Sequence, residues 1–165
     1  MKLIVARHAE TNWHTDPVTG GKTRLGITDA GKKQAEELGK SLGGIDVIYR
    51  SDTQRTLQTA MAIRSTLPTI KTPSSEIPII VDDRLREVDE QEPDRQIKER
   101  VKDFLTDAYA KTPDGTVLAV THGWFTNALK VVLGGENIVI TDSKMIIPTA
   151  TSITYEIGKS KIDAI

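Results

Sequence analysis

Residues 3–8 read Leu-Ile-Val-Ala-Arg-His, and this stretch decides the fold that we predict. Its first four residues are apolar and too few for a helix, so they indicate a short buried strand. The strand ends at an arginine and an imidazole, Arg7 and His8. In open parallel sheets, ligands bind at the carboxyl ends of the strands, and a pair of polar side chains at such an end is a candidate site.

The rest of the chain alternates strand-like and helix-like segments. We expect further strands at residues 46–49, 79–81, 116–120 and 152–157. We expect helices at residues 29–42, 53–67, from Asp94 to about Ala108, and around 125–133. Repeated β-α units predict an α/β fold, a three-layer sandwich with a mostly parallel central sheet and helices on both faces. We expect one domain over residues 1–165, with residues 69–92 as a surface connection.

Composition excludes several classes of protein. The 165 residues include 22 basic and 23 acidic side chains, a net charge of -1, which argues against a nucleic-acid binder or a polybasic membrane binder. The chain has no cysteine, which removes disulfides, thiolate metal sites and cysteine nucleophiles. The apolar start at residues 1–6 is too short for a signal peptide. We therefore expect a cytoplasmic protein.

Polar side chains follow three of the predicted strands. Arg7 and His8 follow the first, Arg55 lies one turn into the helix after the second, and His122 with Gly123 follows the fourth. Carboxyl ends of parallel strands meet at one edge, so we expect these side chains to gather there. Helix N-termini at the same edge add free N–H groups. The predicted ligand is an anion the size of a phosphate.

Residues 7–13, Arg-His-Ala-Glu-Thr-Asn-Trp, resemble the signature of the histidine phosphatase superfamily, the phosphoglycerate-mutase-like branch. The family signature reads Arg-His-Gly-Glu-Thr, with a tryptophan two residues on. Four further segments resemble family motifs in the same order, at residues 27–35, 49–60, 85–87 and 117–123. The resemblance extends from residue 3 to about residue 133, and the joint occurrence of five motifs is far more specific than any one of them.

The resemblance implies an enzyme that hydrolyses a phosphomonoester through a phosphohistidine on His8. Arg7, Arg55 and His122 would hold the phosphoryl oxygens, Gly123 would line the same site, and Glu87 would donate the proton to the leaving group. The expected partner is a small phosphorylated metabolite, with no cofactor, no metal, no nucleic acid and no membrane. The oligomeric state stays open.

The chain departs from the family pattern at four places, and one of them is Arg50, which stands where a small residue is more usual. Ala9 replaces the usual glycine, and His14 stands where an asparagine commonly contacts the transferred phosphoryl group. His14 either takes over that contact or faces solvent. Residues 88–93 read Val-Asp-Glu-Gln-Glu-Pro where the family has an aromatic-Gly-x-Trp-Glu-Gly pattern. The departure at residues 88–93 leaves open whether Glu87 or another acid of residues 82–92 is the proton donor.

Several other functions are alternatives to hydrolysis. A phosphoglycerate mutase, a protein phosphohistidine phosphatase and a non-catalytic phosphate-binding module would all use this fold. A metal site made of His8, His14 and His122 is disfavoured because the neighbouring arginines would repel a cation. Residues 20–23, Gly-Gly-Lys-Thr, suggest a P-loop, but the glycine that this motif requires is replaced by Asp16. An NTPase is therefore not expected.

Overall fold

The computed structural model describes residues 1–12, 25–68 and 76–165. In chain order the elements are β1 (Lys2–Arg7), α1 (Asp29–Ser41), β2 (Val47–Arg50), α2 (Gln54–Thr66), β3 (Ile79–Val81), the 3-10 turn η2 (Asp83–Leu85), α3 (Asp94–Lys111), β4 (Thr116–Thr121), α4 (Gly123–Gly134), η3 (Ser143–Met145), β5 (Ser152–Glu156) and α5 (Lys159–Asp163). Each predicted strand and helix is present, with ends that shift by at most three residues. The sequence did not predict α5.

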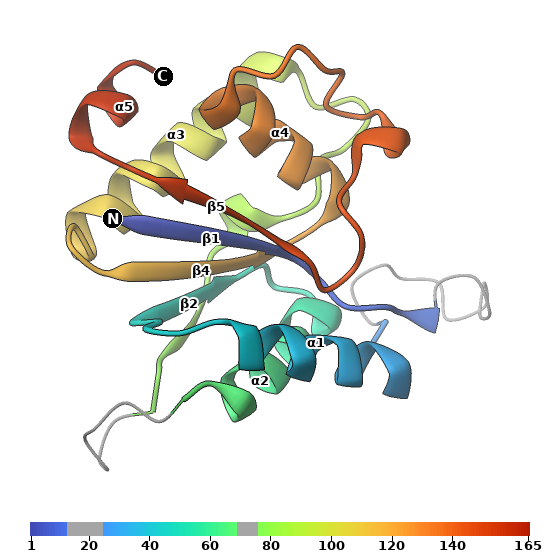
Figure 1. Ribbon diagram of the computed structural model, residues 1–165. Helices are drawn as coiled ribbons and strands as arrows, with labels where there is room; N and C mark the ends of the chain where they lie inside the picture. Colours follow the sequence, from blue (N-terminus) through green and yellow to red (C-terminus); the bar gives the residue numbers. More distant parts are fainter. Residues whose placement is uncertain (13–24, 69–75) are drawn as a thin grey trace.

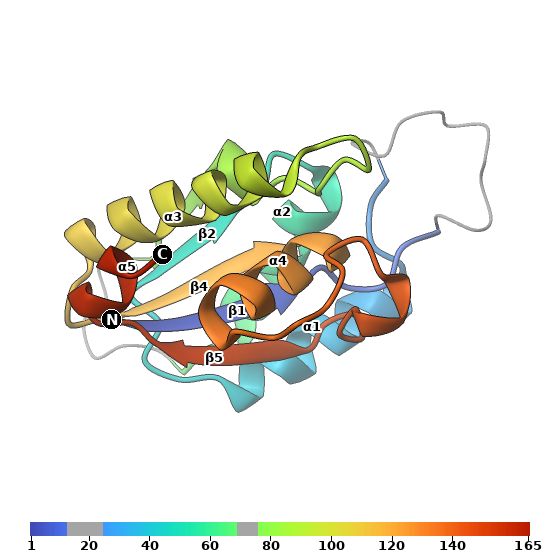
Figure 2. The same cartoon turned by 90° about the horizontal axis from the view of Figure 1, so that it is seen from above.

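The predicted three-layer α/β fold is confirmed. The strands form one sheet in the order β3-β2-β4-β1-β5, in which the β1–β4, β2–β4 and β2–β3 pairs are parallel and the β1–β5 pair is antiparallel. Helices α1 and α2 pack on one face, while α3, α4 and α5 lie on the other (Figures 1 and 2). Each face has its own apolar core, one around Phe104 and Phe125 and the other around Ile48 and Ile63.

Strand register brings the predicted site residues to one edge of the sheet. Arg7, at the end of β1, pairs with Thr121, at the end of β4. Arg50, at the end of β2, pairs with Val120. Hydrogen bonds continue past the strands, because the amide of His8 donates to the Thr121 carbonyl at 2.9 Å. Residues 8, 51 and 122 therefore leave the sheet side by side.

The two helices that follow β1 and β2 begin at threonine N-caps. The Thr28 hydroxyl accepts from the amide of Gly31 at 2.9 Å, and the Thr53 hydroxyl accepts from the amide of Thr56 at 3.4 Å. Such a cap satisfies one of the free N–H groups in the first turn of a helix. Because Thr53 is the N-cap of α2, Arg55 lies in the first turn of that helix, close to the end of β2.

Our description of residues 69–92 as a surface connection is wrong for Leu85, Val88 and Glu92, whereas Ile80 and Val81 are exposed. Leu85 and Val88 are buried in the core beneath α3 and α4, and the Glu92 side chain is only 5% exposed. The many charges in this segment predicted exposure, but Glu92 is paired with an arginine inside the protein. A buried carboxylate is tolerated when such a partner is present. Residues 69–75 lie outside the described part of the chain.

Across the described ranges 1–12, 25–68 and 76–165, none of the helices combines the length and the apolar character that a membrane crossing requires.

Replacing Gly39 by alanine should destabilise the α1–α2 layer. A Cβ atom at this position would lie 2.6 Å from the carbonyl oxygen of Ile63 and 3.0 Å from its Cα, so α1 must move away from the α2 backbone. We expect the free energy of unfolding in urea to fall by about 1–3 kcal/mol. Gly43→Ala is the matched control, because nothing lies within 4 Å of its Cβ position. Equal stabilities of the two variants would contradict this packing.

Candidate active site

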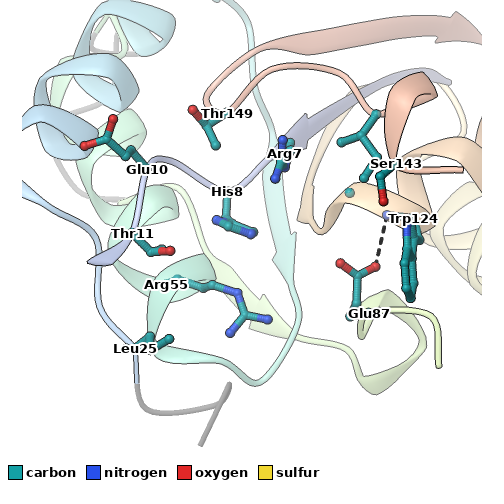
Figure 3. A pocket seen from close by; sticks show the side chains of 12 residues that line it. Arg7, His8, Glu10, Thr11, Leu25, Arg55, Glu87, Trp124, Ser143 and Thr149 are labelled. Atoms are coloured by element: carbon teal, nitrogen blue, oxygen red, sulfur yellow. Dashed lines mark hydrogen bonds between the residues drawn. The ribbon is translucent and has the colours of Figure 1, made fainter. Parts of the chain in front are cut away.

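A cavity of about 360 Å³ opens at the edge of the sheet where β1 and β4 end. It is lined by Arg7, His8, Glu10, Thr11, Leu25, Arg55, Glu87, Gly123, Trp124, Ser143, Ile146 and Thr149. Five of the predicted site residues are thus brought together from four separate segments of the chain (Figure 3). His14, together with Trp13 and the Gly20–Thr23 stretch, lies outside the described residues.

His8 is held with one ring nitrogen free for chemistry. Its side chain is 9% exposed, and its Nδ1 lies 2.8 Å from the carbonyl oxygen of Ala9. A carbonyl can only accept, so Nδ1 carries the hydrogen and Nε2 keeps its lone pair. Ala9 is fixed in turn, because its amide donates to the Thr59 hydroxyl of α2 at 2.9 Å. The geometry therefore leaves Nε2 as the ring nitrogen with an available lone pair.

Burial keeps the His8 imidazole neutral. The pKa of His8 is lowered to about 4, mainly because burial removes water from the charged form. The hydrogen bond to Ala9 opposes this shift, and the positive charges of Arg55 and Arg7 add to it. At neutral pH the ring is consequently unprotonated, which is the form that can attack phosphorus.

His122 is hydrogen-bonded to Arg55 and does not itself line the cavity in the described structure. The two histidine rings are neighbours, with centroids 5.4 Å apart, but His122 is fully buried and is not among the described residues that line the cavity. Its Nδ1 accepts from Nη2 of Arg55 at 2.9 Å, so its Nε2 carries the hydrogen and donates to the Ser51 hydroxyl at 2.7 Å. Burial and the arginine charges lower the pKa of His122 well below 6.5. Its expected direct contact with a phosphoryl group stays a prediction.

The carboxyl group of Glu87 lies against the N-terminus of α4. Its Oε1 accepts from the amides of Val88 and Trp124 at 3.1 Å each and from that of Phe125 at 3.3 Å. An oxygen with three donors has no room for a proton, so the proton of neutral Glu87 belongs on Oε2. In Figure 3 the second carboxyl oxygen points toward the Arg55 side of the cavity.

Opposing forces act on the Glu87 carboxyl, and burial prevails. Burial raises the pKa of Glu87, while the three amides and the positive charge of Arg55 lower it. The net shift is upward, toward the neutral acid. The cavity thus combines an unprotonated imidazole with a carboxyl that holds its proton more tightly than usual.

Sequence reasoning missed several residues of the site. Trp124 lines the cavity beside Glu87, and Ser143, Ile146 and Thr149 come from the segment between α4 and β5. Ser51 fixes the tautomer of His122. The adjacency of Trp124 to Gly123 could have signalled its role, whereas nothing in the local sequence marks residues 143–149.

The depressed pKa of His8 should be visible in the pH dependence of stability. The unfolded chain binds a proton at His8 below a pKa of about 6.5, whereas the folded protein binds one only below about 4. Its contribution is fully present above pH 6.5 and is lost as the pH falls toward 4. Between pH 8 and pH 5 the wild type should lose about 2 kcal/mol more than His8→Asn in urea unfolding. Identical losses would show that His8 titrates normally.

Comparison with known proteins places the chain in a family. Residues 3–94, more than half of the chain, match the histidine phosphatase superfamily (branch 1). Phosphoserine phosphatase 1 of Hydrogenobacter thermophilus is 34% identical over 91 residues, which are 54% of this chain and 39% of that protein. The uncharacterized phosphatase PhoE of Bacillus subtilis is 24% identical over 184 residues, covering 97% of this chain and 91% of that protein. The chain therefore matches well under half of the first relative's length.

Solved structures share the fold. YhfR of Bacillus stearothermophilus is similar with a TM-score of 0.77 at 22% identity, covering 96% of this chain and 92% of that one. A phosphoserine phosphatase of Entamoeba histolytica in complex with phosphoserine has a TM-score of 0.72 at 19% identity, covering 96% and 91%. With the motifs, the cavity and the match over residues 3–94, the chain belongs to branch 1 of the histidine phosphatase superfamily.

Proposed function

We propose that this protein hydrolyses a phosphomonoester of a small metabolite, with His8 as the nucleophile and Glu87 as the proton donor and acceptor. One observation carries the proposal: a neutral imidazole, two guanidiniums and a buried carboxyl line the same cavity. A cavity of about 360 Å³ suits a small ligand. Relatives that are named phosphatases support hydrolysis as the reaction.

In the first step, Nε2 of His8 attacks phosphorus. The N–P bond forms as the bond between phosphorus and the alcohol oxygen breaks, and Oε2 of Glu87 gives its proton to that oxygen. The alcohol leaves, and His8 holds the phosphoryl group with Glu87 as a carboxylate. The unprotonated state of His8 and the raised pKa of Glu87 both favour this step, because a protonated His8 could not attack and an ionised Glu87 could not donate.

In the second step, a water molecule attacks the phosphohistidine. Glu87 takes a proton from this water, an oxygen–phosphorus bond forms, and the N–P bond breaks to release inorganic phosphate. Glu87 regains its proton and His8 regains its lone pair. The same carboxyl serves first as the acid and then as the base. Its position in the lining of the cavity allows both roles.

The two arginines would stabilise the charge on the phosphoryl oxygens. Arg7 and Arg55 line the cavity on either side of His8 (Figure 3). Arg7 is anchored by donation from Nη1 to the Ile147 carbonyl at 3.0 Å, and Arg55 is anchored by His122. Fixed cationic groups supply most of the catalysis in phosphoryl transfer, because they need no rearrangement as the charge develops.

His8→Ala should abolish turnover. We expect the wild type to hydrolyse 4-nitrophenyl phosphate in the presence of EDTA, and the variant to be slower by at least about 10³-fold, because the covalent route is lost. Release of nitrophenol measures the rate, and acid-labile ³²P bound to the wild type reports the phosphohistidine. Activity that survives the substitution, or that requires a metal ion, would refute the proposal. Binding of phosphate without turnover would indicate the non-catalytic module.

Glu87→Gln should make the rate depend on the leaving group. We expect kcat/KM to fall by about 10²–10⁴-fold for benzyl phosphate, whose alcohol must be protonated as it leaves. The fall should be much smaller for 4-nitrophenyl phosphate, because nitrophenolate leaves without help. Asp89→Asn is the matched control, since Asp89 is an exposed acid of the same loop that does not line the cavity in the described structure. The same selective loss in the control would reassign the acid.

A further inference from the structure

Glu87 lies on a segment that has little regular structure of its own. Between η2 and α3 the chain runs through residues 86–93 without a helix or strand. Glu87 must nevertheless hold its carboxyl against the first turn of α4 for the proposed proton transfer. Something outside this segment has to fix its backbone, because irregular segments are otherwise the more mobile parts of a protein.

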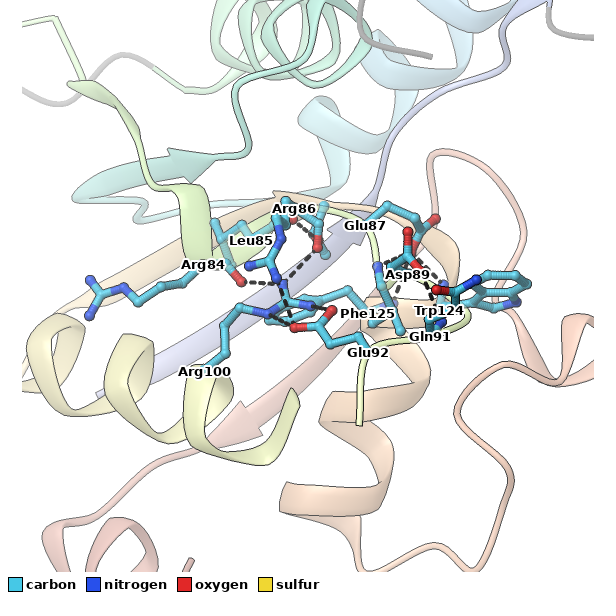
Figure 4. A network of polar contacts seen from close by, with 12 residues as sticks. Arg84, Leu85, Arg86, Glu87, Asp89, Gln91, Glu92, Arg100, Trp124 and Phe125 are labelled. Carbon is cyan, nitrogen blue, oxygen red and sulfur yellow. Dashed lines mark hydrogen bonds and ion pairs between the residues drawn. The ribbon is translucent and has the colours of Figure 1, made fainter. Parts of the chain in front are cut away.

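Arg100 of α3 reaches into this segment and is bound at all three of its nitrogens. The side chain is 7% exposed. Nε and Nη2 donate to the two carboxylate oxygens of Glu92 at 3.0 and 2.8 Å, an arrangement in which the planar fork of an arginine matches a carboxylate. Nη1 donates to the carbonyls of Arg84 and Arg86 at 2.8 Å each. Figure 4 shows the resulting network around Glu87.

The backbone carbonyls of the three residues just before Glu87 all accept side-chain hydrogen bonds. Arg100 holds those of residues 84 and 86, while the Thr121 hydroxyl donates to that of Leu85 at 2.7 Å. Thr121 is the last residue of β4 and directly precedes His122. The backbone that leads into Glu87 is consequently attached both to α3 and to the central sheet.

Arg100 also contacts Phe125, one of the residues whose amides bind the Glu87 carboxyl. Its guanidinium carbon lies 4.8 Å from the centroid of the Phe125 ring, within the range of a cation–π interaction. The amide of Phe125 is one of the donors to Oε1 of Glu87. One side chain therefore touches the residue before Glu87 and the residue whose N–H group binds its carboxyl.

We propose that Arg100, together with Glu92, is a positioning residue that fixes the Glu87 carboxyl at the N-terminus of α4 for proton transfer; this inference rests on the proposed function. Arg100 is not among the described residues that line the cavity, so it acts through Glu87 and not on the substrate. A lysine could keep the charge next to Glu92, but it lacks the planar fork that serves two carboxylate oxygens and two carbonyls at once.

Arg100→Lys tests the inference by the dependence of rate on the leaving group. We expect kcat/KM for benzyl phosphate to fall about tenfold, a part of the loss expected for Glu87→Gln, and that for 4-nitrophenyl phosphate to fall less than about threefold. A role in folding alone would lower both rates equally. Arg84→Lys is the matched control. Arg84 lies in η2, just before this segment, and its side chain binds Asp82 and Asp107 of α3, away from Glu87. The variant should leave the ratio of the two rates unchanged.

The double variant Arg100→Lys/Glu87→Gln separates action through Glu87 from an independent effect. If Arg100 acts only by placing this carboxyl, its substitution should cost nothing more on benzyl phosphate once Glu87 has become glutamine. Additive losses would overturn the inference, as would equal losses on both substrates or no loss at all. Glu92→Gln, which weakens the same network without altering the arginine, should reproduce the selective loss.

Three further outcomes are decisive. If Glu87→Gln itself shows no dependence on the leaving group, the acid role of Glu87 fails, and the positioning role falls with it. If Glu87→Gln shows this dependence while the folded Arg100→Lys and Glu92→Gln variants behave like the wild type, only the positioning role fails. Loss of folding in both variants, judged by circular dichroism, would assign the pair to stability and would also overturn the inference.

Discussion

The parallel pairing of β1 and β2 with β4 is the constraint on which the rest of the structure depends. Because β4 lies between the other two strands, the chain emerges from all three at the same edge and at nearly the same level. His8, Ser51 and His122 are consequently neighbours, although more than 100 residues separate the first from the last. Helices α2 and α4 begin at this edge, so their N-termini also face the site.

Burial governs the chemistry of the cavity more than charge does. Two arginines would by themselves lower the pKa of a nearby carboxyl, yet the pKa of Glu87 is raised because burial outweighs their effect. For His8 the two influences act in the same direction, and the imidazole stays neutral. An unprotonated imidazole and a carboxyl that holds its proton more tightly than usual therefore lie in the same cavity, as the proposed phosphoryl transfer to histidine requires.

Much of the site is supported indirectly by residues outside the cavity. His122 and Ser51 hold Arg55, Thr59 holds the backbone of Ala9 beside His8, and Arg100 with Thr121 holds the segment before Glu87. The supports come from several parts of the fold: Thr59 lies in α2, Arg100 in α3 and Thr121 in β4, while Ser51 and His122 directly follow β2 and β4. A buried network of this kind is rigid when each polar group in it has a hydrogen-bond partner. Removing one residue leaves a buried polar group without its partner, which lowers the stability of the folded protein.

The sequence by itself determined the order of strands and helices, the α/β class, and the presence of Arg7, His8, Arg55, Glu87 and Gly123 at one edge. These follow from periodicity and from short motifs, which are local properties. Only the tertiary structure decided the tautomers of His8 and His122, the position of His122 behind Arg55, the seat of Glu87 on α4 and the burial of Glu92 with Arg100. The reason is that burial and hydrogen-bond partners are set by segments far apart in the chain. No local pattern of charges could distinguish the surface connection that we expected at residues 69–92 from a segment that contains the buried Arg100–Glu92 ion pair.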